Sequence, residues 1–259
     1  MDPALLDDFQ RAAGDLAADE VALAALVARL LDPSVDARAL EARVAALSAG
    51  RAGSDPPWTY LHAAGFQGDV DTYQSLDNSN LAQVLERRRG IPITLGVLLI
   101  RLARDSGRRA VGLNFPGHFL VAVDDLVVDP FVFEVRDHDE LVARLPAQAR
   151  ARPREELFAP CRPVGVAMRM LNNVRLTHAR NGAWDRALQV VDAQLELAPE
   201  HPALYLEQGD LWRRLGAVAG ARLAFERALA YAESSGQEEL SALARNRLEA
   251  LGGGGDVIH

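Results

Sequence analysis

The spacing of apolar residues predicts helices over most of the first ninety positions. In residues 19–31 and 36–50, Ala, Leu and Val recur at helical intervals, and each stretch begins at an aspartate that can cap a helix. The second stretch ends at a glycine. Two further helices are predicted at 57–66 and 78–90, with the polar residues 78–80 capping the second and Gly90 closing it in a left-handed conformation.

The middle of the chain changes from helical to strand-like patterning. Residues 92–107 are apolar on almost every side, which predicts a central buried helix, and Pro92 suits its first turn. The segments 108–115, 118–123 and 125–131 then predict three antiparallel strands, with a tight turn at Asp124–Asp125. A short helix is expected at 137–145. The core is therefore predicted to be α+β, with helices packed on a short antiparallel sheet.

From residue 164 the pattern is helical throughout and repeats itself. When the sequence is compared with itself at a shift of 34 positions, Gly182 matches Gly216 and Ala187 matches Ala221. Paired helices with this period, about 34 residues, are typical of tetratricopeptide repeats. We expect two repeats and a terminal helix at 237–251, although Arg175 and His178 depart from the motif. The residues expected to pack small side chains against large ones are Gly182, Ala187, Gly209, Trp212, Ala221, Phe225 and Ala228.

These patterns divide the chain into five segments. Helices at 1–50 are expected to pack on a core at 51–145, and the helical repeats are expected at 164–251. Residues 146–163 are rich in proline and arginine and lack periodicity, which predicts a linker. Residues 252–259 are expected to form a flexible tail.

Composition narrows the classes of function. The net charge of −8 argues against a nucleic-acid surface, which would normally show a basic face. No stretch approaches 18 uninterrupted apolar residues, so we do not expect a membrane span. The start of the chain lacks the pattern of a signal peptide. The single cysteine, Cys161, excludes an internal disulfide, and the six histidines show no metal-ligand spacing. We therefore expect a cytoplasmic protein without a metal or cofactor.

One pair of residues could carry chemistry. His118 opens the second predicted strand and Asp129 ends the third, so antiparallel pairing would place them side by side. A carboxylate there can fix the imidazole tautomer and leave the other ring nitrogen free as a base. The first turn of the helix beginning at Ile91–Pro92 offers Thr94 as its only side-chain nucleophile. The alternative is that the pair only satisfies two polar groups within the fold.

Three motifs resemble the SirB-type bacterial proteins: "NSNLAQVLERRRGIPITL" at 78–95, "FPGHFLV" at 115–121 and "VVDPF" at 127–131. These proteins join a transglutaminase-like core to C-terminal tetratricopeptide repeats and are named as regulators of sirC expression. The resemblance spans roughly residues 55–250. It implies a papain-like arrangement in which His118 and Asp129 match the family's histidine and aspartate. The nucleophilic cysteine of active transglutaminase-like enzymes would fall near Pro92, where this chain has none.

The resemblance favours a non-catalytic protein that binds a protein or peptide partner through the groove of its repeats. The alternatives are an unconventional hydrolase or acyltransferase using Thr94, His118 and Asp129, and a module that binds a small ligand in the remnant cleft. Asn78, Ser79 and Pro92 are candidates for lining that cleft. Cys161 could replace the missing nucleophile only if the predicted linker folded back over the site. We expect Asp129→Ala to cost about 1–3 kcal/mol of stability.

Overall fold

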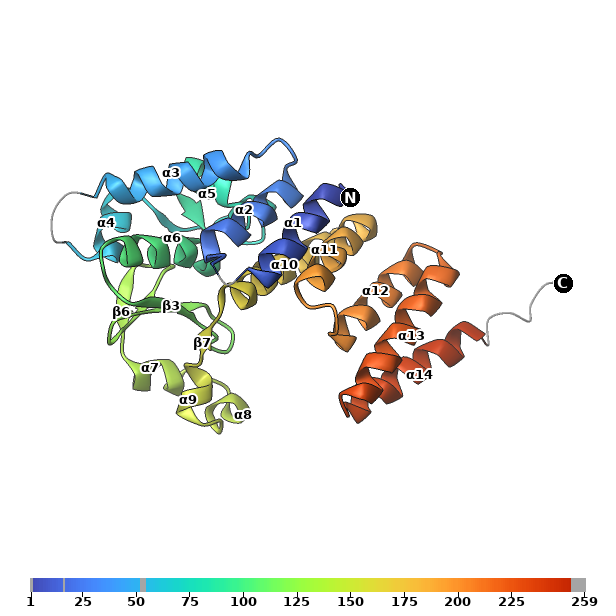
Figure 1. Cartoon of the computed structure of the whole chain (residues 1–259). Coiled ribbons are helices and arrows are strands. Elements are labelled where there is room, and N and C mark those ends of the chain that lie inside the picture. Colours follow the sequence, from blue (N-terminus) through green and yellow to red (C-terminus); the bar gives the residue numbers. More distant parts are fainter. Residues whose placement is uncertain (1, 16, 52–54, 253–259) are drawn as a thin grey trace. The chain divides into compact units, whose positions relative to one another are not determined.

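The computed structural model describes residues 2–15, 17–51 and 55–252 (Figure 1). The chain forms two compact units. One comprises Asp15–Met170, and the other joins the start of the chain, up to Gly14, to the part from Leu171 onward. The boundary falls inside helix α10 (Pro163–Arg180).

In the described part of the Asp15–Met170 unit, the first half contains five α-helices and a short 3₁₀ helix, η1 (Leu76–Asn78). The α-helices are α2 (Glu20–Leu31), α3 (Ala37–Ala49), α4 (Pro57–Ala63), α5 (Leu81–Arg87) and α6 (Pro92–Asp105). The carboxylates of Asp19 and Asp36 accept hydrogen bonds from the first turns of α2 and α3, as the sequence predicts. Helix α6 is buried along nearly its whole length and is contacted by the other four. It is the central helix that the apolar pattern of 92–107 predicts.

Helix α5 ends differently from the prediction at Gly90. Arg88 takes the left-handed C-cap conformation, with φ of 54°, and its backbone N–H donates to Val84 O. Gly90 instead belongs to strand β2 (Arg89–Gly90), which pairs in parallel with β1 (Gln67–Gly68). The helix stops early because the chain must extend to make this pairing.

The sheet has five antiparallel strands in the order β6-β5-β4-β3-β7. Strands β3 (Ala110–Leu113), β4 (Leu120–Val123) and β5 (Leu126–Asp129) form the predicted meander. The outer strands are β6 (Glu134–Arg136) and β7 (Pro160–Cys161). The turn between β4 and β5 lies at Asp124–Asp125, as predicted, and Asp124 adopts φ of 54° there.

Helices cover both faces of the sheet (Figure 1). Helix α6 lies on one face, where the ring of Phe119 fits against Gly96. A Cβ atom at Gly96 would come within 2.5 Å of that ring, so a larger residue would push helix and sheet apart. The opposite face carries α7 (His138–Ala143) and α9 (Arg154–Leu157). Its apolar core consists of Leu113, Phe115, Leu120, Val127, Leu141, Leu145 and Leu157.

The segment expected to be a linker is part of this unit. Residues 146–163 contain α8 (Ala147–Arg150), α9 and β7, and β7 pairs with β3. Leu157 is 1% exposed and Cys161 is also buried. The proline- and arginine-rich composition predicted a linker because it gave no sign that Leu157 and Cys161 are buried. These two residues pack the segment against the sheet.

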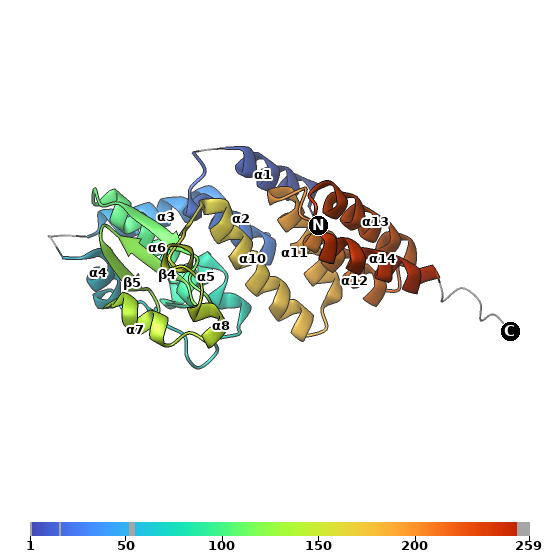
Figure 2. The same cartoon turned by 90° about the horizontal axis from the view of Figure 1, so that it is seen from below.

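The two ends of the chain also differ from the expected division. Helices α2 and α3 pack on the core, but α1 (Pro3–Gly14) belongs to the other unit and packs on α11 (Trp184–Leu197). Figures 1 and 2 both show α1 beside α11. At the other end, Gly252 is the last residue of α14 (Glu238–Gly252), and the rest of the expected tail lies outside the described residues.

In the second unit, α11, α12 (Pro202–Arg214), α13 (Val218–Ser234) and α14 pack in chain order (Figure 1). The turns between helices repeat at the offset that the sequence predicts. Ala183 N donates to His178 O, and Ala217 N donates to Trp212 O, each at 2.9 Å. Gly182 and Gly216 have φ of 72° and 76°, which a residue with a side chain adopts only with strain. Gly182 is therefore a turn residue, not the packing residue that the sequence predicted.

The other predicted packing residues lie inside or against the helical core. Ala187, Ala221, Phe225 and Ala228 are fully buried. A Cβ atom at Gly209 would lie 2.3 Å from the Phe225 ring, so the small residue admits the large one as predicted. The Trp212 ring lies against Gly220, at 3.0 Å from an added Cβ atom, and is partly exposed.

Candidate functional site

His118 and Asp129 form the pair that the strand pattern predicts. His118 lies in the loop before β4, next to the anchored Phe119, and Asp129 ends the neighbouring strand β5. His118 Nε2 lies 2.9 Å from Asp129 Oδ1. The same oxygen accepts the backbone N–H of Phe131 at 2.9 Å. The side chains are 31% and 13% exposed, so the pair lies at the edge of the core and not within it.

The electrostatics of Asp129 determine how the imidazole is held. Burial raises the pKa of this carboxyl, but the hydrogen bond and charge of His118, the Phe131 N–H and the Arg136 guanidinium together lower the pKa below its usual value. The ionised carboxylate can only accept, so His118 Nε2 carries the proton that joins them. When the ring is neutral, this leaves Nδ1 as an acceptor, and no hydrogen bond to Nδ1 is found among the described residues.

Thr94 does not join this pair. Its side chain is fully buried, and its hydroxyl lies 2.8 Å from Asn78 O and 3.0 Å from Ile91 O. The single hydroxyl proton is thus directed at two backbone carbonyls. Pro92, the first residue of α6, is also buried and has no nucleophilic group. The structure therefore does not assemble the Thr94, His118 and Asp129 site that the sequence offered as an alternative.

Asn78 and Ser79 lie inside the domain instead of lining a cleft. Their exposed fractions are 0% and 4%. Asn78 Nδ2 donates to Thr72 O at 2.7 Å, and its Oδ1 accepts from Arg87 Nη1 at 3.2 Å. These bonds explain the burial, because an amide removed from water needs partners on both of its ends. Asn80 caps α5 by accepting from Ala82 N, as the sequence predicts.

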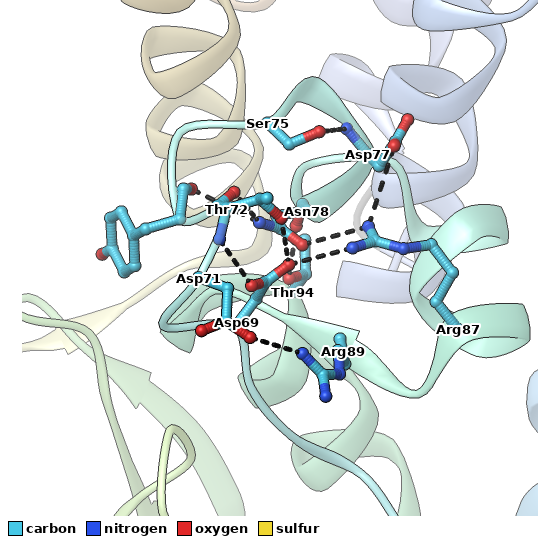
Figure 3. Close-up of polar contacts among 10 residues, drawn as sticks. Asp69, Asp71, Thr72, Ser75, Asp77, Asn78, Arg87, Arg89 and Thr94 are labelled. Atoms are coloured by element: carbon cyan, nitrogen blue, oxygen red, sulfur yellow. Dashed lines mark hydrogen bonds and ion pairs between the residues drawn. The ribbon is translucent and has the colours of Figure 1, made fainter.

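A buried polar network that the sequence did not predict surrounds Asn78 (Figure 3). Asp69 is 1% exposed and accepts from Thr72 N at 2.9 Å, Thr72 Oγ1 at 2.7 Å and Arg87 Nη2 at 2.9 Å. Burial raises the pKa of Asp69, but hydrogen bonds from Thr72, Asn78 and Arg87 outweigh it and hold the pKa far below its usual value. The network fixes residues 69–80 beside the start of α6.

The three arginines of the run "ERRRG" at 86–90 each have a specific partner within the domain. Arg87 bonds Asp69 and Asn78, Arg88 donates to Ala64 O, and Arg89 pairs with Asp71. A weak signal was available, because Asp69 and Thr72 are close together in an aperiodic stretch, which is typical of a side-chain-capped turn. Only the fold shows which arginine meets that turn.

Tyr73 and Arg169 lie near the His118–Asp129 pair. Tyr73 lies on the fixed segment 69–80, is half exposed, and meets Phe131 edge to face with ring centroids 6.0 Å apart. Arg169 comes from α10 and donates to Asn114 Oδ1 at 2.6 Å and to His118 O at 3.3 Å. Its guanidinium also lies over the Phe119 ring. Sequence reasoning missed Arg169 because it placed residue 164 onward among the repeats.

Cys161 does not replace the missing nucleophile. It lies in β7, is 8% exposed, and its Sγ would be 2.7 Å from a Cβ atom at Gly165. Burial raises the pKa of its thiol, which disfavours the reactive thiolate. No hydrogen bond joins it to His118 in the part of the chain that the structure describes.

The described residues were searched for a metal site and for a helix that could span a membrane. Within them, no group of three His, Cys, Asp or Glu side chains is arranged to hold a metal ion. None of the helices found there combines the length and apolar character needed to span a bilayer.

Comparison with known proteins relates part of this chain to the transglutaminase-like superfamily. Residues 59–172 match the model of the transglutaminase-like superfamily. A UPF0162 protein of Xylella fastidiosa is 37% identical over 61% of this chain and 60% of its own length. Protein SirB1 of Salmonella typhimurium is 24% identical over 58% of this chain and 59% of its own length. F-box only protein 21 of Homo sapiens is 28% identical over 58% of this chain but 26% of its own length.

The matches thus span about three fifths of the length of these bacterial relatives. No solved structure was found to match. The matched residues contain the His118–Asp129 pair, the buried Asp69 network and Arg169. Residues 59–172 are therefore a transglutaminase-like domain, and the chain is similar to the UPF0162 proteins and to protein SirB1 over about three fifths of its length.

Proposed function

We propose that this is a non-catalytic transglutaminase-like protein that acts as an interaction or regulatory module. The observation that carries the proposal is the state of the first turn of α6. A nucleophile is expected there, but Pro92 has none and the Thr94 hydroxyl is buried against two backbone carbonyls. A His–Asp pair without a nucleophile to deprotonate cannot begin acyl transfer.

The interaction role is assigned to the helices that follow the domain, which we propose are tetratricopeptide-type repeats. Supporting this, the hairpin turns at Gly182 and Gly216 have matching hydrogen bonds, and the small Gly209 admits Phe225. On one face of α12, Glu207 bonds Arg175 of α10 at 2.6 Å and Asp210 pairs with Arg247 of α14 at 3.2 Å. Alternate helices thus line one face, which in such repeats forms the surface that receives a peptide or helix. We place the protein in the cytoplasm.

The catalytic half of the proposal is tested by acyl-transfer and peptidase assays on the full chain. Glutamine-donor and peptide substrates are expected to show no turnover above that of His118→Ala. The proposal is wrong if wild type transfers an acyl group and His118→Ala abolishes the reaction.

The interaction half is tested by site-specific photo-crosslinking in cells. A photoreactive residue at Ala203, one turn before Glu207 on α12, is expected to capture a protein that then binds the purified chain. Leu223 on α13, which is 53% exposed, provides the matched control position. Capture at Leu223 but not at Ala203 would assign the interaction to a different face.

A further inference from the structure

Arg169 carries a charge for which the described part of the fold supplies no counter-ion. The side chain is partly buried, and its guanidinium donates to Asn114 Oδ1 and to His118 O, which are both neutral acceptors. No carboxylate lies within ion-pair distance of it among the residues that the structure describes. Arginines taken out of water are ordinarily paired with an anion, so this one is an exception that needs a reason.

The titratable neighbours of Arg169 do not supply the missing charge. Burial lowers the pKa of Arg169, and the groups that act on it electrostatically are Cys161 and Tyr73. Burial also raises the pKa of both the Cys161 thiol and the Tyr73 hydroxyl, so both are neutral at pH 7. The guanidinium is therefore partly desolvated among neutral groups, where an arriving anion would interact strongly with it.

Two further polar groups near the His118–Asp129 pair have no hydrogen-bond partner among the described residues. When the ring is neutral, His118 Nδ1 is an acceptor because Asp129 holds the proton on Nε2, and the Tyr73 hydroxyl makes no hydrogen bond to any described residue. Tyr73 is close enough to Arg169 and Asp129 for both charges to affect its pKa, after the larger effect of burial. The rings of Tyr73 and Phe131 form an apolar wall, and Val132 next to it is 37% exposed.

We propose that Arg169, His118 and Tyr73 form a binding site for an N-acylated amino acid with an apolar side chain and a free carboxylate. The carboxylate would bind the Arg169 guanidinium, the amide N–H would donate to His118 Nδ1, and the apolar side chain would pack on the Tyr73–Phe131 wall. The negative charge of Asp129 disfavours a doubly charged anion such as phosphate. The C-terminal residue of a peptide and a free acylamino acid share this chemistry.

This site adds to the proposed interaction role and does not depend on the repeats. The test measures binding of N-acetylphenylalanine to the full chain by calorimetry or NMR titration, with its neutral carboxamide and inorganic phosphate as comparison probes. We expect the acid to bind and the carboxamide to bind about tenfold more weakly or worse, because a charge-assisted bond is lost. Arg169→Met should weaken binding of the acid to the same degree.

Two variants make the result interpretable. Arg109→Met removes an arginine that is 82% exposed and paired with Asp125, and should bind the acid like wild type. Tyr73→Ala removes a half-exposed ring, should leave the domain folded, and should weaken binding several-fold. The proposal is overturned if wild type does not bind the acid, if the carboxamide binds equally well, or if Arg169→Met or Tyr73→Ala binds like wild type.

The same titration distinguishes the two sources of the ligand. Tetrapeptides ending in phenylalanine are used with a free or an amidated C-terminus. Tighter binding of the free tetrapeptide than of N-acetylphenylalanine would assign the site to peptide C-termini. Tighter binding of N-acetylphenylalanine would assign it to a small acylamino acid. Failure of every acid would refute this site and leave the crosslinking test of the repeats unaffected.

Discussion

Two polar clusters of the transglutaminase-like domain differ in how completely they are satisfied. Around Asp69, the carboxylate is 1% exposed and accepts three hydrogen bonds, and the neighbouring Thr94 and Asn78 bond within the domain (Figure 3). Around His118, the side chains are partly exposed, Nδ1 has no partner in the described structure, and Arg169 has only neutral acceptors there. The first cluster has no capacity left for a ligand, and the second does.

This contrast separates a structural role from a binding role. A buried network whose donors and acceptors are all used can only fix the backbone, here residues 69–80. A cluster with unused donors and acceptors at the surface has to bond water or a ligand. Residue type alone would not have separated the two roles, because Thr94 and Asn78 are as chemically suitable for a site as His118 and Tyr73.

The largest expected effect is on the Asp69 network. Asp69→Ala leaves the partly buried Arg87 and the Thr72 donors without their acceptor, and should lower the free energy of unfolding by about 2–3 kcal/mol. Urea unfolding and hydrogen exchange of the α6 amides would measure this. Asp71→Ala is the matched control, since its pair with Arg89 is exposed and such pairs contribute about 0–1 kcal/mol. If Asp69→Ala and Asp71→Ala lowered the free energy of unfolding equally, the Asp69 network would not have the structural role that we assign to it.

The same network predicts how stability depends on pH. The pKa of Asp69 is far lower in the folded state than its unfolded value of about 3.9. Its contribution is therefore fully present above the unfolded pKa and is lost as pH falls toward the folded pKa. We expect the stability difference between wild type and Asp69→Asn to narrow between about pH 5 and pH 2. A difference that stays constant over this range would show that Asp69 is not held ionised.

Asp129→Ala should have a smaller effect of about 1–2 kcal/mol, because its carboxylate bonds His118 and Phe131 N but is less buried than Asp69. The same urea and exchange measurements apply. Asp125→Ala, at a side chain that is 95% exposed, should be neutral. A loss matching that of Asp69→Ala would mean that the His118 cluster is as structural as the buried network.

Thr94→Val is expected to have the smallest effect, about 1 kcal/mol, since it removes the donor to Asn78 O while keeping the side-chain shape. Thr94→Ser should recover most of the stability. Neither variant should change binding of N-acetylphenylalanine, because the hydroxyl bonds the backbone and not the ligand site. If Thr94→Val lost binding of N-acetylphenylalanine while its stability was unchanged, Thr94 would have to be part of the ligand site.

Much of the fold could be predicted from local patterns. The aspartate caps of α2 and α3, the buried helix α6 and the β3–β5 meander follow from spacing that repeats within a few residues. The pattern failed where distant contacts decide the outcome. Strand β7 forms because Cys161 pairs with Gly112, and α5 ends at Arg88 because Arg89 and Gly90 pair with β1.

The candidate site was predicted only in part, for the same reason. The His118–Asp129 pair could be foreseen because two short strands and one turn place those residues side by side. Arg169 could not, since it reaches His118 from a helix 51 residues along the chain. Thr94 had the right chemistry and the right helix, but its hydroxyl direction depends on Asn78, 16 residues earlier.

By itself, the sequence determined the capped helices α2 and α3, the buried helix α6, the β3–β5 meander, the His118–Asp129 pair and the lack of a nucleophile near Pro92. These depend on residue type and on spacing within one turn or one hairpin. The tertiary structure alone decided which polar groups are satisfied and which are free. That property depends on the atoms that distant segments bring within hydrogen-bonding distance, and no local pattern encodes it.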